Sequence, residues 1–239
     1  MNGSRGWLFL SVFSVCGLAA ACDNESSDTP DAAPLIDSPT GGCDPATVLP
    51  SNFRPIPSTS AGMVQVTTAA GVTSGTVDGT AGGVVNSADN PYLYLDLKTG
   101  MKVAINDLDA RSSMAWDIAL KRASLRVNSG DSGTGGRKLA VVQATTLAEV
   151  TAPPASGYNV DDFADAACML IALPIGDPMS AFGEWYAYDT MTHVVTPKSE
   201  VYVLERPDGS HTALRVITYY GDTANPMRGA FYRVEWKQL

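Results

Sequence analysis

Past residue 60, short runs of β-branched and aromatic residues are separated by Gly, Pro, Asn and Asp, which is typical of strands and turns. Segment 92–97 alternates, turns at Lys98-Thr99-Gly100 and resumes at 101–105, which predicts a hairpin with a glycine late in its loop. In 114–120 the large apolar side chains stand at even-numbered positions and share one face, and from Ala123 onward the apolar side chains stand at odd-numbered positions. This shift predicts a β-bulge near Arg122.

The C-terminal part of the chain has the same character. It predicts an antiparallel meander of strands at 184–189, 200–206, 212–220 and 230–236, with a hairpin turn at 207–210. Residues 60–90 are rich in Gly, Thr and Val, and predict weaker strands with turns at Asp78-Gly79 and Gly82-Gly83. Segment 161–170 holds good helix formers, with Asn159 or Asp161 as the candidate N-cap. The pattern therefore predicts one mostly-β domain of antiparallel sheets over residues 58–239, with at most one or two short helices.

The first residues have a different pattern, in which Arg5 precedes an apolar run from Trp7 to Ala21. This run is too short to span a bilayer comfortably and is typical of a signal peptide, here residues 1–21. The run ends in Leu18-Ala19-Ala20-Ala21-Cys22, which is similar to the cleavage site of bacterial lipoproteins. We therefore expect lipidation at Cys22; an ordinary secretory signal that is cut near Ala21 is the alternative.

Residues 22–57 are rich in Asp, Ser, Pro, Gly and Thr, which predicts an acidic, flexible tether behind the lipidated cysteine. The whole chain has 16 basic and 25 acidic residues, and the expected signal peptide contains a single charged residue, Arg5. The mature chain would then carry a net charge of −10. Such a charge argues against nucleic acid and anionic lipid as electrostatic partners. The membrane would be reached through the lipid anchor.

Four cysteines are present, of which Cys16 leaves with the signal peptide and Cys22 takes the lipid. In an oxidising envelope compartment, the remaining Cys43 and Cys168 favour a disulfide, with two unpaired thiols as the alternative. The sequence has no CxxC motif and no Cys/His cluster with zinc spacing, so a structural metal is not expected.

Catalytic signatures are scarce, since there is no GxSxG motif and there are two histidines in all. The glycine-rich segment 130–136 lacks the Lys-Ser/Thr of a P-loop, and we interpret it as a long, mobile hairpin loop. The neighbouring carboxylates Asp161 and Asp162 fit a solvated helix end better than a glycosidase pair. We therefore expect a binding protein and not an enzyme.

Two blocks of sequence, taken together, resemble the HmuY-like family of haem-binding bacterial envelope lipoproteins. The resemblance covers roughly residues 90–239, and the order and spacing of the blocks are more specific than either block alone. The first block comprises Trp116-Asp117-Ile118-Ala119-Leu120-Lys121-Arg122, Arg126-Val127-Asn128-Ser129-Gly130 and Ser132-Gly133; the second comprises Trp185-Tyr186-Ala187-Tyr188-Asp189, Thr192-His193, Pro197, Val201-Tyr202-Val203, Asp208-Gly209 and Thr218-Tyr219-Tyr220.

The resemblance implies an all-β domain in the envelope, at the outer membrane, that captures haem or a related porphyrin and passes it to an outer-membrane receptor. The family holds the iron with histidine pairs or with methionine. A surface lipoprotein of the same fold with a non-haem binding or structural role is the alternative. Aromatic side chains that could line a porphyrin pocket, or simply pack the sheets, are Trp116, Trp185, Tyr186, Tyr188, Tyr219 and Tyr220.

His193 and His211 are the imidazoles available to haem iron. They flank a strand on the order of 20 Å long, so they would lie at opposite ends unless residues 194–199 fold back. The ordinary interpretation is a polar residue after a turn for His211, and a loop residue bonded to its own backbone for His193. Met191, and more remotely Met101 and Met179, are alternative ligands, although methionine is more often core filler.

Overall fold

The computed structural model describes residues 43–83 and 89–239, which are mostly β. The described residues contain two short α-helices, α1 (Pro45–Val48) and α2 (Asp107–Ala110), and two 3-10 turns, η1 (Ser51–Phe53) and η3 (Leu147–Glu149). The strands are β1 (Val64–Ala69), β2 (Val72–Asp78), β3 (Leu93–Asp96), β4 (Met101–Val103), β5 (Ile118–Lys121), β6 (Ser124–Val127), β7 (Lys138–Val142), β8 (Tyr158–Asn159), β9 (Tyr186–Asp189), β10 (Val194–Pro197), β11 (Val201–Glu205), β12 (His211–Thr218) and β13 (Phe231–Gln238).

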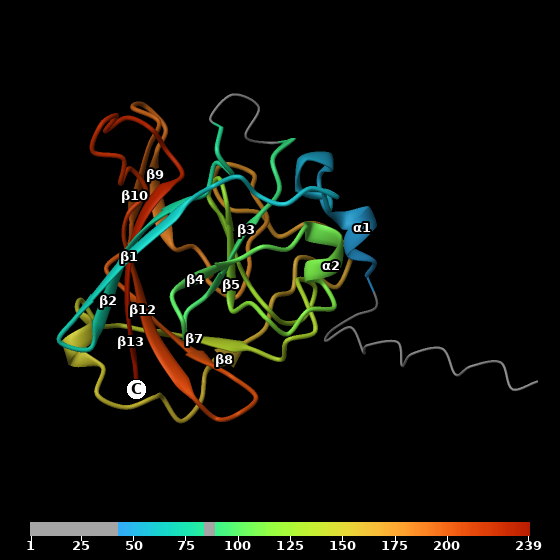
Figure 1. Cartoon of the computed structure of the whole chain (residues 1–239). Helices are drawn as coiled ribbons and strands as arrows, with labels where there is room; N and C mark the ends of the chain where they lie inside the picture. Colours follow the sequence, from blue (N-terminus) through green and yellow to red (C-terminus); the bar gives the residue numbers. More distant parts are fainter. Residues whose placement is uncertain (1–42, 84–88) are drawn as a thin grey trace, which may run out of the picture. The chain divides into compact units, whose positions relative to one another are not determined.

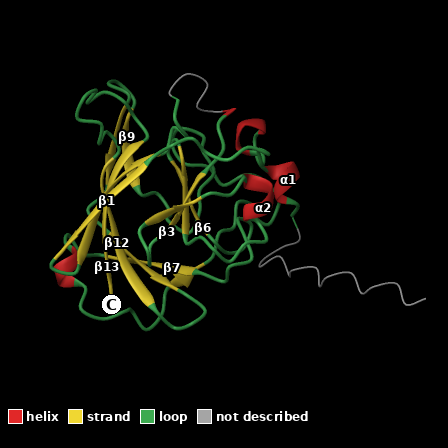
Figure 2. Cartoon of the chain, viewed as in Figure 1, coloured by secondary structure: helices red, strands yellow, loops and turns green. Residues whose placement is uncertain are grey.

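These strands form three antiparallel sheets (Figures 1 and 2). The largest has seven strands in the order β1-β2-β13-β12-β11-β7-β8, the second has the order β4-β3-β5-β6, and β9 pairs with β10 alone. The expected fold class is therefore confirmed. The expected meander holds for β11, β12 and β13, whereas β9 leaves the large sheet and makes a separate hairpin.

The main core contains apolar side chains from the seven-stranded and the four-stranded sheets. Strand β13 shows how the sequence positions them, because buried Tyr232, Val234 and Trp236 alternate with more exposed residues, as a period of two requires. The indole Nε1 of Trp236 donates to the carbonyl of Leu97 at 2.8 Å, which ties the two sheets together. The alternation read from the sequence therefore decides which face of β13 is buried.

A buried ion cluster centred on Asp117 makes a second link between the sheets. Asp117 precedes β5, and its carboxylate accepts from Arg137 Nε at 3.1 Å and from Arg206 Nη2 at 2.7 Å. Arg137 precedes β7 and Arg206 follows β11, so both guanidinium groups belong to the large sheet. The backbone N–H of Leu97 also donates to Asp117, at 2.9 Å. The Asp of the first sequence block therefore has a structural role.

The predicted helix at 161–170 is wrong. The carboxylate of Asp161 is buried and accepts from the backbone N–H groups of Val127 and Ala181, each at 2.9 Å, and from Ser132 Oγ at 2.6 Å. Cys168 adopts a positive φ of 58°, which a helix does not allow. Long-range hydrogen bonds to a buried carboxylate thus override the local helix propensity of the segment.

Two interpretations of the first sequence block also need correction. The phase shift near Arg122 is a tight turn and not a bulge: Lys121 pairs with Ser124 across the β5–β6 hairpin, and Arg122 has φ 51°. The glycine-rich segment 130–136 is a packed connection between two sheets and not a hairpin loop: it joins β6 to β7, and Gly135 donates to the side chain of Asn128 at 2.9 Å. A Cβ at Gly133 or Gly135 would collide with that same side chain, so the glycines serve close packing.

Part of the expected tether, residues 43–57, contacts the domain. Leu49 and Phe53 are buried in a second core cluster with Tyr92, Trp116 and Phe163, because the segment contains enough apolar surface to dock. Cys43 and Cys168 form a disulfide that fastens this segment to the domain. The expected signal peptide, Cys22 and the tether up to residue 42 lie outside the described residues. None of the helices in the described ranges has the length and apolar character needed to cross a membrane.

Candidate ligand site at the end of the large sheet

The β9–β10 hairpin and the connection from β12 to β13 lie side by side at one end of the large sheet (Figure 1). Tyr188 pairs with Val195 in the hairpin, and the Val195 N–H donates to the hydroxyl of Tyr220 at 3.0 Å. Tyr220 follows β12, so the hairpin packs against the C-terminal end of that strand. The turn of the hairpin, residues 190–193, is therefore held beside residues 219–230.

His193 lies at the end of this turn and is exposed to solvent. It has φ 58°, and its Nδ1 is 2.7 Å from the hydroxyl of Tyr188. The carboxylate of Asp189 accepts from the N–H groups of Met191 at 2.8 Å and Thr192 at 3.2 Å, which fixes the turn. Met191 itself is 88% exposed. The hairpin therefore presents an imidazole of fixed orientation next to an exposed thioether.

Beneath the hairpin lies a cluster of aromatic rings. Trp185, Tyr186 and Tyr232 are buried, and the Tyr219 ring centroid is 6.1 Å from that of Trp185 and 5.4 Å from that of Tyr232. Burial raises the pKa of Tyr219, so its phenol stays neutral. The partly exposed rings of Tyr188, Tyr219 and Tyr220 form the rim of this cluster. This rim offers apolar and aromatic contact area to a flat ligand.

A hollow of ≈ 440 Å³ opens beside the β12–β13 connection, with Arg122, Tyr219, Met227 and Arg228 among its lining residues. Its volume falls within the range of small-molecule sites. Arg228 lies 3.4 Å from Asp222 and its guanidinium stacks 4.2 Å from the Phe231 ring centroid. Met227 is 76% exposed. The hollow thus combines cationic groups with a thioether and an aromatic ring.

The structure does not bring His193 and His211 together. His211 begins β12, whereas the hairpin of His193 packs at the other end of that strand, and eight residues span about 26 Å. The His211 Nε2 lies 3.5 Å from a carboxylate oxygen of Glu205, and its side chain is 19% exposed. Residues 194–197 do fold back, but as β10 along β9, which does not bring His193 to His211.

The other candidates from the sequence are distributed over the molecule. Met179 is partly buried against the main core. Met101 starts β4 beside Gly100, which lies close to Trp236 near the C-terminal end of β13, away from the hairpin. Trp116 is buried in the second core cluster and donates to the carbonyl of Ala110 at 2.8 Å.

Three residues of the hollow were missed by sequence reasoning: Arg122, Met227 and Arg228. Met227 and Arg228 occupy a polar connection with no strand or helix pattern, and Arg122 lies in a turn 105 positions before Met227 in the numbering. Their only signal in the sequence is the presence of a methionine and an arginine in a turn-rich segment. Within residues 43–83 and 89–239, no group of three or more His, Cys, Asp and Glu side chains could hold a bare metal ion.

A model of the HmuY protein family matches residues 88–232, which is more than half of the chain. The chain belongs to the HmuY family. This confirms the family that the two sequence blocks indicated. No curated protein matches the chain.

Solved structures are similar to this chain at low sequence identity. The apo HmuY analog of Tannerella forsythia has a TM-score of 0.50 and 16% identity, over 74% of this chain and 96% of that one. A candidate lipoprotein of Bacteroides fragilis has a TM-score of 0.49 and 17% identity, over 72% and 92% of the two chains. A candidate HmuY-like haem-binding protein of Bacteroides vulgatus has a TM-score of 0.48 and 16% identity, over 70% and 91%.

Proposed function

We propose that this HmuY-family chain binds haem or a related porphyrin as cargo, at the surface formed by the β9–β10 hairpin and residues 219–230. Family membership supports the ligand class, and the pair of Tyr188 and His193 carries the location. The protein would act as a binding protein, without catalysing a reaction on its ligand. The residues present suit such a ligand in three respects, namely an imidazole, an apolar rim and nearby cations.

His193 is the proposed iron ligand. An imidazole binds iron through a ring nitrogen that carries no proton, and a hydrogen bond at the other nitrogen selects that tautomer. When Nδ1 carries the proton, it donates to the Tyr188 hydroxyl oxygen at 2.7 Å, and the lone pair of Nε2 is available to the metal. Tyr188 thus supplies the outer hydrogen bond that ligating histidines ordinarily have.

The apolar rim and the arginines suit the remainder of a porphyrin. Tyr219 and Tyr220 offer ring faces to the macrocycle, and Arg122 and Arg228 offer guanidinium groups to its carboxylates. Met191 shares a turn with His193, so it is poorly placed to approach the iron from the opposite face. Met227, on the adjacent connection, is the better candidate for a second ligand.

Haem titration of the full chain, followed in the Soret band, tests this proposal. The expected result is saturable one-to-one binding that His193→Ala abolishes or strongly weakens. His211→Ala removes an imidazole at the other end of β12 and is the matched control, so its affinity should equal that of the parent. Tyr188→Phe should weaken binding about 10- to 100-fold, since it removes the outer hydrogen bond of the ligand.

Two outcomes would contradict the proposed site. If His211→Ala abolished binding while His193→Ala did not, the iron site would lie elsewhere. If the folded parent bound no haem at all, the alternative of a surface lipoprotein with a non-haem binding or structural role would replace the proposal.

The compartment is part of the same proposal. A signal peptide over residues 1–21 and a lipidated Cys22 would anchor the domain in the cell envelope, with delivery to an outer-membrane receptor as the purpose of capture. Incorporation of labelled fatty acid into the parent, lost in Cys22→Ser, is the expected result. Equal labelling of both chains, or no labelling of either, would count against the anchor.

A further inference from the structure

The edge of the large sheet at β1 has none of the usual protection against pairing with another strand. Strand β1 is the first strand in the order of the sheet, and five of its six residues are exposed. In natural proteins, lysine, proline, bulges or short length keep edge strands from pairing with other strands. Here the strand reads Val-Gln-Val-Thr-Thr-Ala, and its register with β2 is unbroken from Val64 to Ala69. The opposite edge, β8, has only two residues.

The β1–β2 turn shows which backbone groups point away from the sheet. Ala70 and Gly71 both have positive φ, 49° and 77°, so the two-residue turn has type I′ character and Ala69 and Val72 form its closing hydrogen-bonded pair. Hydrogen-bonded pairs alternate along an antiparallel ladder. Gln65 and Thr67 therefore bond to β2, while the N–H and C=O groups of Val64, Val66 and Thr68 point to the free edge. Within the described ranges these three residues make no further backbone hydrogen bond.

We propose that β1 pairs in antiparallel fashion with β1 of a second copy of this chain, about a twofold axis at Val66. In this register Val66 faces the partner's Val66, and Val64 faces the partner's Thr68. Every outward-pointing backbone group then meets another, which gives about six hydrogen bonds between the copies. A twofold axis also closes the assembly at two copies, since it uses the same edge on both.

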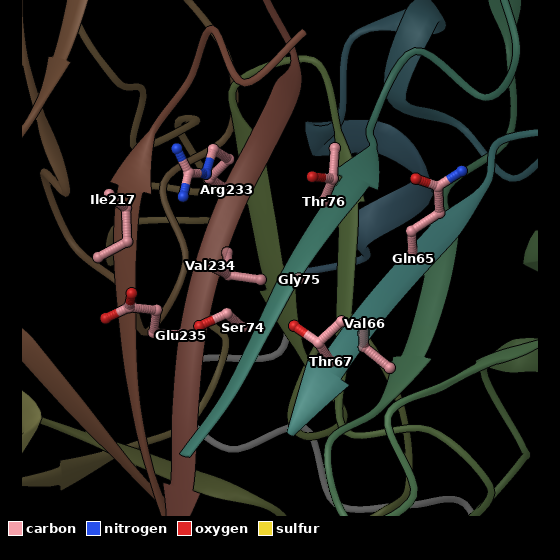
Figure 3. Close-up of a pocket in the computed structure, with 10 residues that line it drawn as sticks. All are labelled: Gln65, Val66, Thr67, Ser74, Gly75, Thr76, Ile217, Arg233, Val234 and Glu235. Carbon is pink, nitrogen blue, oxygen red and sulfur yellow. The ribbon is translucent and has the colours of Figure 1, made fainter. Parts of the chain in front are cut away.

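The side chains of β1 fit this arrangement. Gln65 would face the partner's Thr67 on the outer face of the sheet, where an amide and a hydroxyl can bond to each other. Figure 3 shows both residues at the side of a polar groove of ≈ 260 Å³ that continues to Arg233 and Glu235, so the second copy would extend this groove. Strand β1 carries no charge in a chain of net charge −9, so two copies meet there without direct repulsion.

Analytical ultracentrifugation of the full chain, without haem, over a range of concentrations tests the proposal. The parent should show a concentration-dependent dimer. Thr68→Pro deletes one outward N–H and should shift the equilibrium to monomer, because a proline on an edge strand costs the sheet itself little. Thr68→Ala is the matched control. The proline and the alanine variant both lose the 2.8 Å hydrogen bond between the Thr68 and Thr73 hydroxyls, but only the alanine variant retains the outward N–H. A parent that is monomeric at every concentration overturns the proposal.

A charge swap tests the register independently of proline. The double variant Gln65→Lys, Thr67→Lys places lysines opposite lysines across the twofold axis and should be monomeric. The double variant Gln65→Glu, Thr67→Glu should be monomeric for the same reason, while a mixture of the two should form heterodimers. A mixture that stays monomeric, or either double variant that dimerises as the parent does, refutes this pairing.

Discussion

Replacement of Asp117 by asparagine should strongly destabilise the domain, because this carboxylate neutralises two buried guanidinium groups. The side chains of Asp117 and Arg206 are 2% and 5% exposed, and that of Arg137 is 11% exposed. An amide of the same shape keeps one acceptor oxygen but leaves both cations without their counter-ion. Removing one partner from a buried ion pair costs about 3–5 kcal/mol. Against a typical total stability of about 5–15 kcal/mol, this is a large loss.

Urea unfolding followed by tryptophan fluorescence measures the effect. With a typical slope of about 1–3 kcal/mol per molar urea, the midpoint should fall by roughly 1–5 M. Glu184→Gln is the matched control, since Glu184 pairs with Lys198 at 3.5 Å with side chains 62% and 37% exposed. An exposed pair of this kind contributes about 0–1 kcal/mol, so the midpoint of the control should hardly move.

The same variant separates a structural role of Asp117 from a role in ligand binding. Folded Asp117→Asn without urea should titrate with haem as the parent does, because the cluster joins the sheets and lines neither the hollow nor the β9–β10 turn. A free-energy change below about 1 kcal/mol, or a loss of haem binding at unchanged stability, would refute the reasoning.

Three further predictions concern positions that the fold places under constraint. Burial raises the pKa of Asp161 from 3.8 to about 6. The protonated carboxyl therefore stabilises the fold fully below about pH 4, and about 3 kcal/mol of this stability is lost as the pH rises through 6. The free energy of unfolding of Asp161→Asn, measured at pH 4 and pH 7, should lack this pH-dependent difference. The double variant Cys43→Ser, Cys168→Ser should lower the free energy of unfolding in urea by about 2–5 kcal/mol, since the disulfide joins two residues that are 125 positions apart. No change would mean that the N-terminal segment docks without the disulfide. Gly130→Ala should lower the free energy of unfolding by about 1–3 kcal/mol more than Gly157→Ala in the same assay. Both glycines have positive φ, but only at Gly130 would a Cβ meet the backbone carbonyl of Asp161. Equal losses would count against close packing at Gly130.

Sequence reasoning succeeded for the strands because their signal is local. The alternation in 230–236 reports the face that is buried, whereas the apolar run in 92–95 is buried on both faces; both patterns are visible without knowledge of the partner strand. The two family blocks contain the turn glycines and buried residues that these sheets require. The fold class and the family were therefore accessible from the residues alone.

Sequence reasoning failed where a long-range contact decides the outcome. Segment 161–170 has helix formers, but hydrogen bonds from Val127 and Ala181 to the Asp161 carboxylate hold it in an irregular conformation. The composition of residues 43–57 is that of a linker, and the sequence indicated the disulfide between Cys43 and Cys168 but not the burial of Phe53 in the core. In both segments, the decisive partner is tens of residues away or more.

By itself, the sequence determined that this chain contains a mostly-β domain of the HmuY family, with an export signal expected ahead of it. The candidate ligand site was decided by the tertiary structure, which separates His193 from His211 and places His193 with Tyr188, beside a connection that holds Met227 and Arg228. Strand propensity depends on near neighbours along the chain, whereas a ligand site depends on which strand ends meet in space. That choice is made by the order and register of the strands, which no local pattern specifies.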